Sequence, residues 1–347
     1  MLFVYLVLAA LSLFGIHFHL KSFNDEYLSH EKTLSIKGVF TVLVFCRHFK
    51  QYVELGNGFF DKAFTLIDYY LWQLIVVVFL FCSGYGIMAQ MIRNGKGYVK
   101  AFLKHRFLPV YCSFAICIVF FLLVDCLIGR ISNYSWWKIV LAFTGWTSVG
   151  NSNWFMFDTF ALYLLTFISF IIPFKNEKYS LLLFTFFSFC LVAVLYLTKS
   201  ATWWNTLLCF PLGMWYGVYK KRIDKIMKNN KCYLYSLLII LLLFLFVWKN
   251  HYRDTSLIYI IVALFFSMVV TLITMKIDIS NKVLEFFGRH LFSIYILQRI
   301  PFLILDNKIE NYYLFFVCSF SITILVSVFY DYFFGKIRLL FQRVRHN

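Results

Sequence analysis

Long apolar stretches recur along this chain, and they restrict its fold more than any other feature. Of its 347 residues, 62% are hydrophobic and 14% are charged, whereas a soluble domain carries roughly a quarter charged residues. An apolar stretch of about 17 to 25 residues predicts a transmembrane helix. Short segments of alternating hydrophobicity, which indicate a β-barrel, do not stand out. The sequence therefore predicts an all-α, polytopic integral membrane protein.

We expect about eleven transmembrane helices in a single domain that covers residues 1–347. The first span lacks a charged leader and a clear cleavage site, which favours a retained helix over a signal peptide. The predicted spans are 2–20, 37–53, 67–90, 107–128, 154–174, 179–197, 203–219, 232–248, 257–275, 290–305 and 312–334.

The basic residues lie mainly in alternate segments between these spans. By the positive-inside rule, the basic segments face the cytoplasm, which predicts an external N-terminus and a cytoplasmic C-terminus in a cell membrane. This pattern accounts for the net charge of +17 without nucleic acid as a partner. The basic segments are 21–37, 93–106, 175–178, 220–231, 276–289 and the C-terminal tail.

The nine cysteines lie mostly within apolar spans and show no C-x-x-C spacing. Such cysteines behave as small buried hydrophobic residues. We therefore predict neither a disulfide framework nor a metal site.

The stretch "KGVFTVLVFCRH" places Arg47 and His48 inside a predicted span. His48 follows Lys37 by eleven residues, roughly 16 Å along a helix, which is near the middle of a hydrocarbon core about 30 Å thick. Ionisable groups at that depth are costly and usually functional. The alternative is that both side chains reach the outer interface and are solvated there.

Two other spans carry polar groups to a similar depth. Unpaired charges would be very costly there, so Asp158 either pairs with Arg47 or Arg299 or orients a catalytic group. Asp68, Asp125 and Asp331 lie near span ends, where we expect solvated or helix-capping carboxylates, and His290 has no assigned role. The polar residues at this depth are Asp158, just after Trp154, and Tyr295, Gln298 and Arg299.

Histidine, with a pKa of about 6.5, is a natural general base at neutral pH. A neighbouring arginine can stabilise an oxyanion or hold an anion. No G-x-S-x-G, H-E-x-x-H or Walker sequence is present. The residues fit histidine-based acyl transfer in the membrane and equally fit proton-coupled transport.

Five stretches, in the same order, resemble the membrane acyltransferase 3 family. In that family a basic residue, usually arginine, precedes a histidine by ten intervening residues, as Lys37 precedes His48. "FLFCSGYGI" resembles its Ser-Gly-Tyr/Phe segment, and "FLKHRFLPVY" keeps Arg106 three residues before a proline but has Leu103, beside Lys104, at the other arginine position. "NWFMFDTFALYLL" is similar to its Trp-Phe segment, and "FGRHLFSIYILQRIP" has Gln298 where the family has histidine.

The resemblance covers residues 33–335, so the first span is additional to a ten-helix core. It implies transfer of an acyl group, usually acetyl, from acetyl-coenzyme A to a hydroxyl of a cell-surface or exported saccharide. No permanently bound cofactor is implied, and the partners are the bilayer, the acyl donor and the saccharide. A transporter or flippase for a lipid-linked saccharide is the alternative.

The resemblance and the depth argument together give a candidate site. His48 is the expected general base or acyl carrier, Arg47 and Arg299 stabilise negative charge, and Asp158 orients a partner. The basic segment and the glycines have plainer alternatives, which are topology and helix packing. The donor-binding candidates are Lys37, Ser83, Gly84, Tyr85, Lys104 and Arg106, and the acceptor-binding candidates are Trp154, Tyr295, Gln298 and Arg299.

Overall fold

The computed structural model describes residues 1–19, 22–172, 174, 176–253, 255–306 and 308–343, with backbone only for 337–343. Some basic residues of the predicted charge pattern lie outside the described residues or side chains. These are Lys21, Lys175, Arg338, Arg343 and Arg345.

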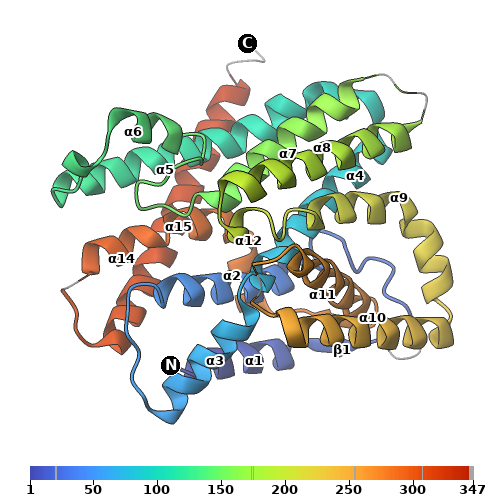
Figure 1. The fold of residues 1–347 in the computed structure, drawn as a ribbon, viewed down its shortest axis with the longest axis horizontal. Helices are drawn as coiled ribbons and strands as arrows, with labels where there is room; N and C mark the ends of the chain where they lie inside the picture. The colour runs from blue at the N-terminus through green and yellow to red at the C-terminus, as the bar shows by residue number, and fades with distance from the viewer. Residues whose placement is uncertain (20–21, 173, 175, 254, 307, 344–347) are drawn as a thin grey trace.

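The described chain is almost entirely helical, as the composition predicts. Its longer helices are α1 (Phe3–Phe14), α2 (Leu34–Phe49), α3 (Phe59–Leu71), α4 (Leu74–Phe102), α5 (Leu108–Leu127), α7 (Trp154–Ile171), α8 (Glu177–Thr198), α9 (Cys209–Met227), α10 (Asn230–His251), α11 (Ile258–Thr274) and α15 (Tyr312–Arg343). Shorter elements are η1 (Leu103–Phe107), η2 (Ile131–Asn133), α6 (Trp136–Ala142), η3 (Ala201–Trp203), α12 (Lys282–Arg289), α13 (Leu291–Leu297) and α14 (Arg299–Leu305). In Figure 1, α2 lies near the centre, between the α5–α7–α8 layer and the α1–α3 end.

Five segments of the described chain are long and apolar enough to cross a membrane. The first of them, Leu74–Leu127, joins α4, η1 and α5, and so contains parts of two predicted spans. Three shorter apolar helical stretches, Phe3–Phe14, Ile258–Thr274 and Leu291–Leu305, add to these. The multi-pass membrane character is confirmed, while the count of eleven spans stays a prediction.

The first predicted span, 2–20, is not one helix. α1 ends at Phe14, and β1 (Ile16–Phe18) pairs antiparallel with β2 (Ile277–Ile279). Gly15 permits this turn, because a Cβ at that position would lie 2.6 Å from the Ser280 carbonyl oxygen. Backbone pairing at this edge replaces the last part of the expected helix.

Two other predicted spans are interrupted. Residues 67–90 are divided at Trp72, whose positive φ of 34° ends α3 before α4 begins. Residues 290–305 are divided at Gln298, between α13 and α14. Pro301 explains this second break, because it has no N–H for the Leu297 carbonyl and its ring crowds that carbonyl.

The basic segment 93–106 is helical and not the loop that the sequence suggested. α4 passes through it with a kink at Gly95, whose φ of 58° suits glycine. The helix then widens into a π turn, η1, which carries Lys104 and Arg106. Pro109 lies four residues after His105 and cannot donate to its carbonyl, which accounts for the wide turn.

Glycines bring two pairs of helices into backbone contact. A Cβ on Gly84 of α4 would lie 2.0 Å from the Phe210 carbonyl oxygen of α9, and a Cβ on Gly213 would lie 2.1 Å from that of Phe81. α2 and α12 cross in the same manner, where Gly38 faces Leu284 and Gly288 faces Leu34. The packing interpretation therefore holds for Gly84, whereas Gly86 has open space beside it.

Gly84 and Gly86 provide a matched test of the α4–α9 crossing. Gly84→Ala should destabilise the protein by about 3 kcal/mol, because the methyl group meets backbone that cannot give way. Gly86→Ala should be neutral or stabilising, since alanine is the better helix former. Thermal unfolding of the detergent-solubilised variants measures both. Equal unfolding temperatures for the two variants would contradict the crossing.

Candidate functional site

His48 lies in the last turn of α2 and is buried. Its ring centroid is 6.1 Å from that of Tyr295 on α13. The Gln298 side chain approaches the imidazole, while the His48 Nδ1 atom is buried without a hydrogen-bond partner. His48 therefore keeps at least one ring nitrogen free for chemistry.

The break between α13 and α14 adds polar groups beside His48. Gln298 is fully buried, donates to the Tyr295 carbonyl oxygen at 3.1 Å and leaves its Oε1 atom without a partner. The Tyr295 hydroxyl is also unpartnered. Gln298 is the single residue between α13 and α14, and it keeps helical backbone angles (φ −57°, ψ −24°).

Asp158 of α7 contributes a buried carboxylate to the same region. Its exposure is 0%, and neither carboxylate oxygen has a hydrogen-bond partner. Asp158 and Arg299 both lie within electrostatic range of Tyr295, and Ser152 faces the Tyr295 hydroxyl without a well-formed hydrogen bond. The pairing of Asp158 with Arg47 or Arg299, which the sequence left open, is not present among the described side chains.

Arg47 points to a different carboxylate. Its Nη1 atom lies 2.5 Å from Asp68 Oδ2 on α3, and Lys50 Nζ lies 3.0 Å from the same oxygen. Asp68 is 3% exposed, so the expectation of a solvated or capping carboxylate is wrong. Two cations from the end of α2 need a counter-charge away from water, and the carboxylate on α3 supplies it.

Arg299 opens α14 near the end of α2. Its guanidinium donates to the Gln51 side-chain oxygen and lies 5.9 Å from the Tyr52 ring centroid. Its Nε atom is buried without a partner. No acidic side chain of the described residues forms an ion pair with it, so part of its charge remains available to an anion.

Two residues of the predicted donor set, Lys37 and Arg106, lie within electrostatic range of His30, which precedes α2. Burial and the positive charges of Lys37, Arg289 and Arg106 lower the pKa of His30. These residues come from the start of α2, from α12 and from η1. The sequence missed His30 and Arg289, because only the α2–α12 crossing brings them beside Lys37.

Three donor candidates, Ser83, Tyr85 and Arg106, have structural partners. Ser83 lies 3.2 Å from the Tyr163 hydroxyl, and the Arg106 guanidinium lies 5.8 Å from the Tyr163 ring centroid. Tyr85 packs on Tyr216 with ring centroids 6.4 Å apart, and Lys104 is exposed. Tyr163 thus links two candidate stretches that are far apart in the sequence.

Trp154 lies at the first turn of α7, partly buried, and packs edge-on against Phe155, with ring centroids 5.8 Å apart. Phe155 in turn packs against Tyr295, at 5.3 Å. The Phe155 ring therefore lies between Trp154 and Tyr295, the neighbour of His48.

One polar cluster was not foreseen. His290 Nδ1 lies 2.5 Å from Asp331 Oδ2, and Ser293 Oγ donates to the same oxygen at 2.7 Å. Asp331 therefore fixes α13 to α15 rather than capping a helix. The motif "FGRHLFS" was noted in the sequence, but nothing in it indicated a partner on α15.

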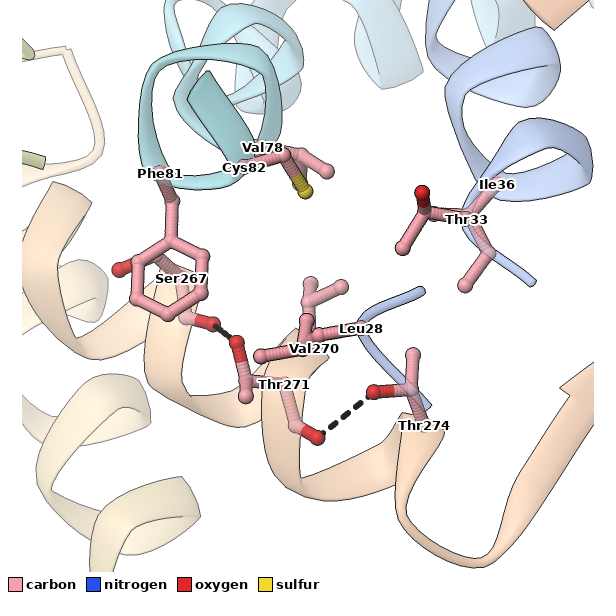
Figure 2. Close-up of a pocket in the computed structure, with 10 residues that line it drawn as sticks. All are labelled: Leu28, Thr33, Ile36, Val78, Phe81, Cys82, Ser267, Val270, Thr271 and Thr274. Carbon is pink, nitrogen blue, oxygen red and sulfur yellow. Dashed lines mark hydrogen bonds between the residues drawn. The ribbon is translucent and has the colours of Figure 1, made fainter. Parts of the chain in front are cut away.

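Two cavities lie against α2 and α4. The α11 cavity is drawn in Figure 2 with all its lining residues, and Cys82 and Thr33 project towards it. Thr271 and Thr274 on its wall donate to carbonyls of their own helix. The α13 cavity is small, and Tyr295 and Gln298 are among its lining residues. Its other lining residues are Thr41, Val44, Phe79, Phe155, Met156, Leu291, Phe292 and Ile294.

Comparison with known proteins adds one finding. A family model described as an acyltransferase domain matches residues 35–332, close to the 33–335 range that the motifs indicated. No curated protein and no solved structure matches the chain significantly.

No group of three or more metal-binding side chains occurs among the described residues.

Asp68 and Asp158 should respond in opposite ways to the same substitution. Asp68→Asn should lower the free energy of unfolding by about 3 kcal/mol, because it leaves two partly buried cations without a counter-charge. Asp158→Asn should leave stability unchanged or increase it, because an unpaired buried carboxylate is itself costly. Thermal unfolding in detergent measures both, and a larger loss for Asp158→Asn would contradict this assignment.

Proposed function

The chain belongs to the acyltransferase 3 family, and on that premise we propose that it transfers an acyl group from acyl-coenzyme A to a hydroxyl of a cell-surface or exported saccharide. It is a multi-pass membrane protein with an acyltransferase domain. The donor, the acceptor and the catalytic residues are our proposal.

The cluster around His48 is the observation that carries this proposal. His48, Asp158, Tyr295 and Gln298 are buried, come from three helices and each keep a polar atom without a partner. Buried polar groups are normally hydrogen-bonded, and leaving one unpaired costs about 1–3 kcal/mol. A substrate that supplies the missing partners would explain why the fold tolerates this cost.

In the proposed reaction His48 accepts the proton of the acceptor hydroxyl as its oxygen attacks the thioester carbonyl. The new carbon–oxygen bond forms, the carbon–sulfur bond breaks, and the proton passes to the departing coenzyme A thiolate. General base catalysis of this kind contributes about 10²–10⁴-fold to the rate. Transfer through an acyl group carried on His48 would use the same ring in two steps.

Arg299, Tyr295 and Gln298 are the groups that could stabilise the developing oxyanion. Donors held in a water-poor site are effective, because they need no reorganisation during the reaction. Arg47, which the sequence also nominated, is tied to Asp68. We assign it the role of fixing the end of α2, from which His48 projects, so it is a positioning residue.

The basic cluster of Lys37, Arg106, Arg289 and His30 supports binding of a coenzyme's phosphate groups. Cations from three separate elements lie within electrostatic range of His30, and arginine suits phosphate geometry. Lys37 lies at the start of α2 and His48 at its end. We propose that the Lys37 end of α2 faces the cytoplasm. The phosphates of the donor would bind at that end, while its acyl group reaches His48.

His48→Ala should reduce transfer of label from acetyl-coenzyme A to the extracted surface saccharide by at least 100-fold. The exposed His17 on β1 is the matched control, and His17→Ala should keep wild-type transfer. Transfer is measured in membranes with equal amounts of inserted protein. Undiminished transfer by a folded His48→Ala variant would refute the catalytic role.

Arg106→Ala should raise the KM for the acyl-coenzyme A donor by about tenfold and change kcat little, since a lost phosphate contact is worth roughly 1.4 kcal/mol. Arg222→Ala, at an exposed position of α9, serves as the control. Initial rates over a range of donor concentrations give both constants. An unchanged KM would show that Arg106 does not bind the donor and that its charge only helps to orient the chain in the membrane.

A further inference from the structure

The α13 cavity is lined mainly by apolar side chains. Transfer of an acetyl group does not require such a lining. We propose that the cavity binds the acyl chain of the donor and that the preferred donor carries a short linear acyl chain of more than two carbons. This inference rests on the proposed acyl transfer.

The position of the cavity links it to the reacting groups. It runs along α13 from Leu291 to Gln298, and its lining includes Tyr295 and Gln298, the two residues that approach His48. On α2, Val44 lines it one turn before His48. An acyl carbonyl held at His48 therefore has the cavity directly beside its alkyl end.

The lining of the cavity restricts its occupant. Eight of its lining residues are aliphatic, aromatic or methionine side chains, and the hydroxyl of Thr41 is already donated to the Lys37 carbonyl. The polar groups that remain are the Tyr295 hydroxyl and the Gln298 amide, both at the His48 end.

Only one part of the reactants matches such a wall. The saccharide carries many hydroxyls and the arm of coenzyme A carries amides, and burying these without partners is unfavourable. The acyl chain is the part that is entirely apolar. Each methylene buried favours binding by about fourfold, so the cavity should select for chain length.

Competition between donors tests this directly. Wild-type protein in membranes receives equal concentrations of labelled acetyl-, butyryl-, hexanoyl- and decanoyl-coenzyme A, and transfer to the saccharide is measured for each. We expect kcat/KM to rise about fourfold per added methylene from acetyl and then to fall once the cavity is full. A profile in which acetyl is the best donor would overturn the proposal.

Filling the cavity should reverse the preference. Val44→Phe should lower the ratio of hexanoyl to acetyl transfer at least tenfold, whereas Val194→Phe, at an exposed position of α8, should leave the ratio at its wild-type value. If the cavity instead holds the lipid of the acceptor, Val44→Phe will reduce all donors equally, which refutes the proposal. Absence of transfer from every donor would refute the proposed function itself.

Discussion

Buried charged groups need protein partners, and the end of α2 is organised around this requirement. A charge that is buried away from water and has no partner is strongly unfavourable. Arg47 and Lys50 share the carboxylate of Asp68, and this leaves the next helical face, with His48, free of a counter-ion. Had Arg47 paired with Asp158 instead, the carboxylate would not remain open towards Tyr295. The ion pair is thus structural, and the groups it leaves unpaired form the candidate site.

Backbone geometry then brings the helices of the site together. Gly38 and Gly288 let α2 approach α12 closely enough for backbone contact, and Lys37 and Arg289 both lie within electrostatic range of His30. Pro301 cannot donate to the Leu297 carbonyl, and Gln298 beside this interruption approaches His48. Pro109 widens the helix at η1, where Arg106 lies. Residues that weaken helices therefore position most of the polar groups to which we assign a function.

The sequence predicted much of this, and its errors have physical causes. Hydropathy identified the membrane class, the motifs identified the family, and intramembrane depth brought His48, Asp158, Tyr295 and Gln298 to one level. Partners across helices could not be predicted, because depth does not say which helices touch, so the Arg47–Asp68 pair was missed. Hydropathy windows also cannot detect a break caused by one proline or a strand pair such as β1–β2, which explains the divided spans.

The central claim is that acyl transfer takes place at the cluster around His48. The most direct measurement is a cryo-electron microscopy structure of the full chain with a non-hydrolysable thioether analogue of hexanoyl-coenzyme A that keeps the carbonyl as a ketone. Our account predicts the carbonyl-side end of the acyl group within hydrogen-bonding distance of the His48 ring, the alkyl chain along α13, and the phosphates beside Lys37 and Arg106. An analogue bound with its acyl end away from α2 and α13 would contradict the account.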